Sequence, residues 1–67
     1  MVQNQIRSLF LLFAGEEELP DAVQPVLDEA VLEVQQALKD GADEDDARLN
    51  WLAAAVAFLR YTEITAA

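Results

Sequence analysis

The sequence has no cysteine, no histidine and only four basic residues among its 67. Without cysteine the chain forms no disulfide and offers no thiolate as a metal ligand or nucleophile. Without histidine it lacks the commonest metal ligand and general base. The single serine, Ser8, has no imidazole partner, and two glycines, Gly15 and Gly41, are too few for a phosphate-binding loop. We therefore expect a protein that is not an enzyme and that uses no cofactor and no metal.

The shortage of basic residues leaves a strongly acidic chain. Thirteen acidic residues against four basic ones give a net charge of -9, although 54% of the residues are apolar. DNA, RNA and anionic membranes repel such a chain, so we expect it to bind neither nucleic acid nor membrane. The expected partners are further copies of the chain, joined through apolar faces, and virion proteins or other proteins with basic surfaces.

No segment of the sequence resembles a membrane span, which needs roughly 18 consecutive apolar residues. The N-terminal stretch MVQNQIRSLFLLFAGEEE contains an apolar core at 9–14 that is shorter than that of a secretory signal peptide. No small-residue cleavage site follows it. We therefore expect a protein of the cytoplasm or of a virion.

The spacing of apolar residues predicts one all-α domain, 1–67, with three helices and no strand. The first helix covers about 2–14 and ends at Gly15. A short helical turn at 20–24 precedes the second helix, about 25–39, where Lys39 complements the helix dipole and Gly41 is the stop. The third helix covers about 43–63, with Asp43 as its N-cap. Short connections predict a small bundle in which successive helices are antiparallel.

The acidic stretch DGADEDD at 40–46 is the most metal-like feature of the sequence. An EF-hand loop needs oxygen ligands at positions 1, 3 and 5, glycine at 6 and glutamate at 12. No register starting at Asp40 or Asp43 meets this pattern. Carboxylates in the first turn of a helix interact favourably with its dipole, so helix capping accounts for the stretch without a metal.

The third helix, RLNWLAAAVAFLRY at 48–61, is apolar on two faces. One face carries Leu49, Leu52, Ala53, Val56 and Leu59, and the other carries Trp51, Ala54, Ala55, Phe58 and Tyr61. Two interpretations of the aromatic residues stay open. In one, they close the core of a three-helix unit. In the other, they form a contact between subunits, where aromatic residues are enriched.

The size of the chain favours the second interpretation. A domain of about 60 residues buries only about 60% of the surface that its unfolded chain exposes, so it gains much from association. The predicted interface consists of the large and small apolar residues of the first and third helices: Phe10, Phe13, Trp51, Ala54, Ala55, Phe58 and Tyr61.

The two arginines of the third helix have structural interpretations. Arg48 lies four residues after Glu44, a spacing that allows an ion pair on one helix face. Arg60 can stack on an aromatic ring. The basic residues are scattered over positions 7, 39, 48 and 60, which is not the pattern of a nucleic-acid interface.

Two stretches of the sequence resemble a known family. VLDEAVLEV at 26–34 and DARLNWLAAAVAFLRY at 46–61, joined by an acidic loop, are similar to small phage and prophage virion-assembly proteins of the helical head–tail connector type. The resemblance covers roughly 19–61. It implies an all-α protein without enzymatic activity that assembles as a ring between portal and tail. The chain is shorter than a typical connector and lacks the extended loop and C-terminal part of that family.

Two hypotheses of function follow. The first is a structural or assembly protein, encoded by a phage or prophage, that forms a homo-oligomer through apolar helix faces. The second is an acidic regulator or inhibitor that presents Glu16–Glu18 and Asp43–Asp46 to a basic protein surface, as a DNA mimic does.

Overall fold

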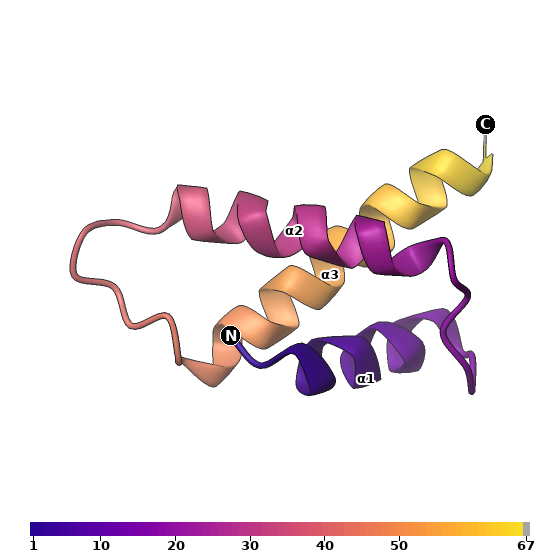
Figure 1. Ribbon diagram of the computed structural model, residues 1–67, viewed down its shortest axis with the longest axis horizontal. Helices are drawn as coiled ribbons and strands as arrows, with labels where there is room; N and C mark the ends of the chain where they lie inside the picture. The colour runs from indigo at the N-terminus through magenta and orange to yellow at the C-terminus, as the bar shows by residue number, and fades with distance from the viewer. Residues whose placement is uncertain (67) are drawn as a thin grey trace.

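The computed structural model describes residues 1–66, which form three α-helices: α1 (Gln3–Ala14), α2 (Val23–Ala37) and α3 (Ala47–Ala66). No strand occurs among these residues. Successive helices run in opposite directions along the long axis of the molecule (Figure 1). The prediction of a small all-α bundle of three antiparallel helices is confirmed.

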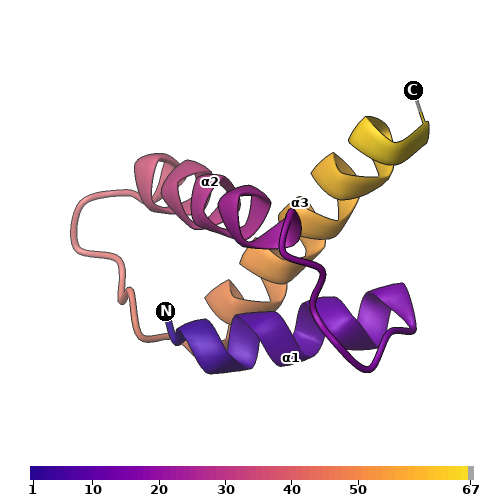
Figure 2. The ribbon, with the colours of Figure 1, turned by 45° about the vertical axis from the view of Figure 1, so that its right-hand side comes forward.

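The helices form two layers. α1 and α2 make the first layer, and α3 makes the other, beginning beside the start of α1 and crossing behind α2 (Figures 1 and 2). Both α1 and α2 pack on α3 but barely contact each other. The molecule measures 36 × 23 × 16 Å, and its shortest axis leaves no room for a third layer of helices about 10 Å wide. α3 is apolar in several directions because two helices share it.

The first helix ends where the sequence predicted. Gly15 adopts a left-handed conformation with φ 70°, and its N–H donates to the carbonyl of Leu11. The N–H of Glu16 donates to the same carbonyl at 3.1 Å. A glycine suits this position because a side chain would strain a positive φ.

The second helix lies two residues earlier than predicted at both ends. It begins at Val23, and Pro25 occupies its first turn, where the missing N–H of a proline costs nothing. It ends at Ala37 because Leu38 is extended, so Lys39 lies outside the helix. Gly41, with φ 85°, is part of a later turn in which the N–H of Ala42 donates to the carbonyl of Lys39 at 3.0 Å. The prediction that Gly41 ends this helix is therefore wrong.

The third helix begins at Ala47, four residues after the predicted start. Asp43 does not cap it; its carboxylate accepts the N–H of Asp45 at 2.9 Å, within a turn that ends at Asp46. Asp46 is the N-cap instead, because its carboxylate accepts the N–H of Arg48 at 2.9 Å. Spacing alone did not distinguish four consecutive acidic candidates.

The core lies between the two layers. Each helix contributes buried apolar side chains, and the contribution of α3 is made of alanines only. The buried residues are Ile6, Phe10, Val23, Leu27, Ala30, Val31, Val34, Ala53, Ala54 and Ala57. Leu52 and Leu59, which the sequence placed on the same face as Ala53, are about half exposed.

One polar side chain, Asn50, is buried in this core with 3% of its surface exposed. Its Oδ1 accepts the backbone N–H of Val2 at 2.9 Å, and its Nδ2 donates to Oε1 of Gln5 at 2.7 Å. Both partners belong to the start of α1, for which no side chain of its own supplies a cap. Asn50 therefore fixes where α1 lies along α3.

We predict that Asn50→Leu lowers the free energy of unfolding by about 1–3 kcal/mol, because it leaves the Val2 N–H and the Gln5 amide without partners. Urea unfolding followed by circular dichroism at one fixed protein concentration measures the change. Gln36→Leu on the exposed side of α2 is the matched control and should change stability by less than about 0.5 kcal/mol. Equal stability of Asn50→Leu and the parent chain would contradict this role.

The cap of α3 predicts a pH dependence. The Arg48 guanidinium hydrogen-bonds the carboxylate of Asp46 at 2.6 Å, and together with the Arg48 N–H it lowers the pKa of that carboxyl from 3.8 to about 2. Because the pKa is lower in the folded state, the interaction stabilises the fold above about pH 4 and is lost as the pH falls toward 2. Carboxyl carbon NMR shifts should report this pKa, and Arg48→Met should move it back toward 3.8. An unchanged pKa in that variant would show that the guanidinium is not the cause.

Candidate interaction surface

An aromatic cluster joins α1 to α3. The ring of Phe10 meets Phe58 and Tyr61 edge-on, with centroid distances of 6.0 and 5.6 Å. The ring of Phe13 lies 5.9 Å from Trp51 and 6.3 Å from Phe58. Distances and angles of this kind are favourable for aromatic pairs. These aromatic side chains therefore hold α1 against α3 within one chain.

The structure divides the predicted interface residues into three groups. Phe10 and Ala54 are buried in the core, so neither contributes to an outward surface, and they leave the candidate interface. Phe13, Phe58 and Tyr61 are partly buried in the aromatic cluster. The two that face outward are Trp51, which is 52% exposed, and Ala55.

A partly uncovered apolar surface follows the side of α3 away from the core, and its edge at Trp51 also contacts Phe13 of α1. It consists of Trp51, Leu52, Ala55 and Leu59, which we call the outer face of α3. At about 100° per residue, these positions lie opposite the buried residues Asn50 and Ala57. Leu52 and Leu59 are 49% and 54% exposed. The outer face is thus a third apolar side of the helix, in addition to those that contact α1 and α2.

Leu52 and Leu59 are the members of the outer face that sequence reasoning missed, because a two-face interpretation assigned them to the core. The signal that identifies them is the alternating spacing of Arg48, Leu52, Ala55, Leu59 and Thr62. Steps of four and three residues are the pattern of a helix that packs against one further helix. The sequence could be explained with two apolar faces on this helix, but in the structure α3 has three apolar sides.

Charged residues border the outer face without interrupting it. The sequence predicted that Arg60 stacks on an aromatic ring. Instead, Arg60 pairs with Glu33 of α2 at 3.0 Å and with Glu63 at 3.6 Å. These carboxylates raise the pKa of the Arg60 guanidinium. Arg48 pairs with Asp46 at 2.6 Å rather than with Glu44. Both arginines thus interact with acidic residues and not with rings.

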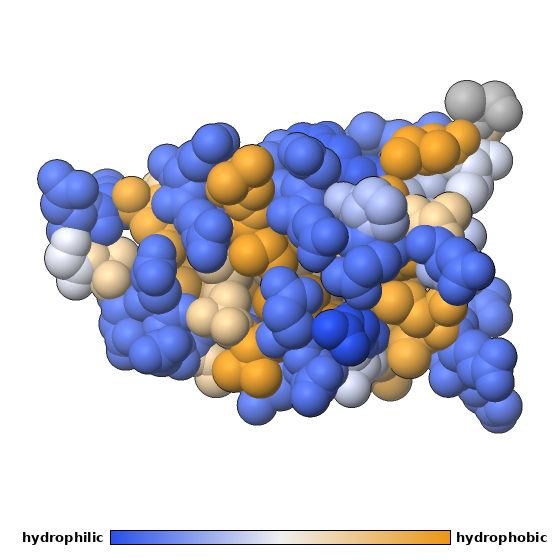
Figure 3. Space-filling view, in the orientation of Figure 1, coloured by the Kyte–Doolittle hydropathy of each residue, from blue (hydrophilic) through white to orange (hydrophobic). Residues whose placement is uncertain are grey.

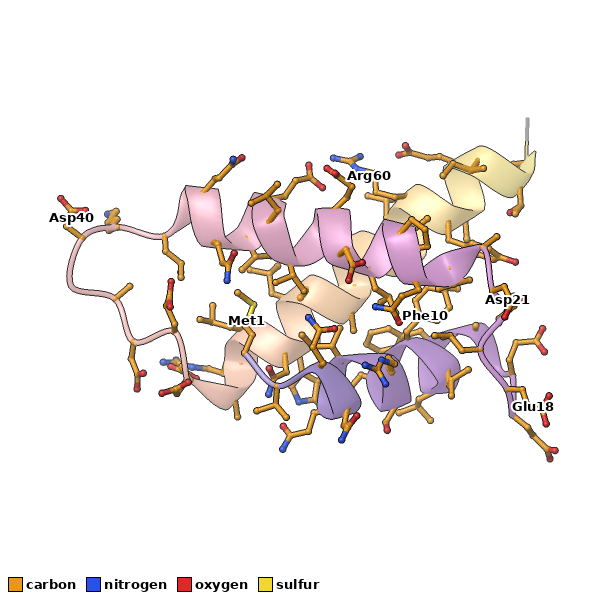
Figure 4. All side chains as sticks on the ribbon, in the orientation of Figure 1. Met1, Phe10, Glu18, Asp21, Asp40 and Arg60 are labelled. Carbon is orange, nitrogen blue, oxygen red and sulfur yellow. The ribbon has the colours of Figure 1, made fainter. Side chains whose placement is uncertain are left out.

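Most of the negative charge lies away from α3. That helix carries two of the four basic residues and one of the 13 acidic ones, so its net charge is +1 and the rest of the chain carries -10. Glu18 and Asp21 mark one end of the long axis and Asp40 the other (Figure 4). Copies that meet through α3 therefore bring together helices that carry one acidic residue each.

The acidic segments have structural contacts of their own. The backbone nitrogen of Met1 donates to the carbonyl of Glu44 at 2.6 Å and lies 3.9 Å from a carboxylate oxygen of Asp45. Asp43 and Asp46 hold the turn before α3. Within residues 1–66, no three acidic side chains converge in a way that could hold a metal ion. In the same range no helix has the length and apolar character that crossing a membrane requires.

Shallow grooves flank α3 on both sides. The groove toward α2 has an apolar floor and two charged residues at its edge; it is lined by Glu33, Val34, Ala37, Leu52, Val56 and Arg60. The groove toward α1 is lined by Asn4, Gln5, Ser8, Leu9 and Trp51. Both grooves are open to solvent. Leu52 and Trp51 connect them to the outer face, so the three form one continuous surface.

The opposite side of the molecule differs. Where α1 and α2 face the viewer, hydrophilic residues cover most of the surface and apolar groups are scattered between them (Figure 3). Isolated exposed apolar side chains of this kind are ordinary for a folded protein. The ordered apolar row on α3 is the feature that needs an explanation.

Comparisons of the chain with protein-family models, with curated proteins and with solved structures give no match. The similarity to head–tail connectors therefore stays a prediction from the sequence.

The placement of Phe10 gives a testable consequence. Phe10→Ala should lower the free energy of unfolding by about 3–5 kcal/mol, because Phe10 is 1% exposed at the centre of the aromatic cluster. A loss of that size leaves a small domain largely unfolded. Leu12→Ala, on the same helix but at a position that is 68% exposed, is the matched control and should have little effect. Thermal unfolding of both variants checks this; a folded Phe10→Ala protein that merely fails to associate would return Phe10 to the interface.

Proposed function

We propose that this chain is a non-enzymatic assembly protein whose copies associate through the outer face of α3. The observation that supports this proposal is the row of half-exposed Trp51, Leu52 and Leu59 on a helix that already packs against α1 and α2 on its other sides. A monomer leaves this row in water. Association covers it.

The energy at stake is large for a domain of this size. Complete burial of a large apolar side chain is worth about 1.5–3 kcal/mol, and three such side chains are only half buried here. The total stability of a small domain is about 5 kcal/mol. Covering the outer face would therefore add a substantial fraction of that stability.

The overall dimensions support the same proposal. The accessible surface is 4625 Å², whereas a compact monomer of 7.4 kDa is expected to expose about 4200 Å². The radius of gyration is 11.7 Å against about 11 Å expected for 67 residues. Both differences have the direction expected of a subunit whose packing is completed by another chain.

The sequence resemblance gives this proposal a biological setting. We propose a phage or prophage virion-assembly role, in the cytoplasm or in the virion, as for a head–tail connector. Genes for portal, capsid and tail proteins beside the gene for this chain would support that setting. A neighbourhood without virion genes would count against it while leaving self-association to be tested separately.

The acidic regulator or DNA mimic remains the second hypothesis, but no specific observation favours it. Its acidic segments lie at opposite ends of the molecule, and Asp43 and Asp46 already accept backbone hydrogen bonds. A partner bound through surface charge alone would be released by salt. An apolar contact would persist.

The central test is the mass in solution as a function of concentration. We expect sedimentation velocity to show a discrete oligomer, and because apolar burial drives it, this oligomer should persist in high salt. Trp51 is the only tryptophan, so its emission should shift to longer wavelength when dilution separates the copies and exposes the ring. A protein that stays monomeric at every accessible concentration would contradict the proposal.

A further inference from the structure

We infer that two copies of this chain dock as a symmetric antiparallel pair through α3. Leu52 of each copy lies opposite Leu59 of the other, and Ala55 lies beside the two-fold axis. This inference rests on the proposed self-association and specifies its geometry. The second copy is chosen as the occupant from the residue spacing, the charge distribution and the surface available.

The spacing of the outer face is self-complementary. Leu52 precedes Ala55 by three residues and Leu59 follows it by four, so reversing one helix about an axis beside Ala55 brings the two leucines opposite each other. Ala55 has the smallest side chain of the row, which allows two helix backbones to approach closely at the crossing point. A two-fold contact requires a self-complementary patch of this kind, because the same patch is used on both partners.

The charged residues at the two ends of the row are complementary as well. In the antiparallel arrangement, Arg48 near the start of α3 comes close to Glu63 near the end of the second copy's α3. The Arg48 side chain is 90% exposed although it pairs with Asp46, and that of Glu63 is 56% exposed although it pairs with Arg60. A guanidinium has five N–H donors and a carboxylate about four acceptor sites, so each can add a contact to the second copy. Each pair occurs twice in a symmetric dimer.

The acidic turn before α3 disfavours the parallel alternative. A parallel pair would bring Asp43–Asp46 of one copy against the same four carboxylates of the other. The antiparallel pair separates the two turns by about the length of the helix, roughly 30 Å for 20 residues. That distance is several times the Debye length of about 8 Å at physiological ionic strength, so the repulsion is screened.

The available surface is adequate for a dimer. A stable interface covers about 800 Å² per partner, which is about a sixth of the 4625 Å² exposed here. The outer face and the two flanking grooves together offer a surface along most of α3. The groove lined by Leu52, Val56 and Val34 lies where Leu59 of the second copy arrives.

Single cysteines test the geometry, since the chain has none of its own. Ala55→Cys should form an intermolecular disulfide under mild oxidation, because residues beside the axis lie within disulfide reach. Thr62→Cys should not, because seven residues from the axis on each copy separate the two thiols by about 20 Å. Ala42→Cys, exposed in the loop before α3, is the control for random collision.

A charge reversal provides a second test of the antiparallel geometry. Arg48→Glu places like charges at both ends of the contact and should raise the dimer Kd roughly 3–10-fold. Adding Glu63→Arg to the same chain should restore the affinity, and circular dichroism should show equal helix content throughout. No rescue, with both variants folded, would overturn the pairing of Arg48 with Glu63.

The mass of the reduced Ala55→Cys protein separates this inference from the proposed function. An oligomer that cross-links at position 55 and not at 62 supports both. Cross-linking at 62 as efficient as at 55 indicates a parallel pair and overturns the inference alone. An oligomer in which neither position exceeds the Ala42→Cys control associates through another surface; this overturns the inference and also the outer face of α3 as the contact, and leaves only self-association. A reduced protein that is always monomeric overturns both.

Discussion

The fold depends on the close approach of two helices to one row of alanines. Ala53, Ala54 and Ala57 are fully buried and form the inner side of α3, so α1 and α2 can both lie against the same helix without needing each other. Larger side chains at these positions would push the two layers apart. The bulk of the core then comes from the opposite layer, where Ile6, Phe10 and Leu27 fill the space above the alanines. The same arrangement leaves the far side of α3 with nothing to cover it.

Regular features of the sequence were enough to predict the architecture. Gly15 at the end of an apolar stripe marked the end of α1, and the periodic stripe of Val23, Leu27 and Val34 marked the buried side of α2. The start of α3 was less determined, because any of four consecutive acidic residues can cap a helix. In the structure Asp46 is the cap, where its carboxylate also accepts the Arg48 guanidinium, while Met1 contacts Glu44 and Asp45 in the turn before it. The contacts of Met1 are long-range and are not readable from local propensity.

The candidate surface was predicted only in part, for a geometric reason. A helix that is apolar all round can be divided into faces in several ways, and the division depends on how many neighbours it has. If α3 had one neighbouring helix within the chain, Leu52 and Leu59 would belong to the core. Because α3 has two, α1 and α2, these leucines lie outside the core. The position of Asn50 shows which side of α3 faces the core, since its amide is buried there. Its hydrogen bonds to the start of α1 orient α3 and so determine which residues face outward.

The distribution of charge is compatible with the proposed self-association of so acidic a chain. A net charge of -9 opposes any contact between copies, but the opposition depends on where the charges meet. Here the carboxylates collect in the two loop regions at the ends of the long axis, and α3 carries a slight positive charge between them. The outer face of α3 carries apolar side chains and no carboxylate, so the proposed contact between copies buries apolar surface with little repulsion. The negative charge then acts as a constraint on geometry, because it permits contact along α3 and disfavours contact end to end.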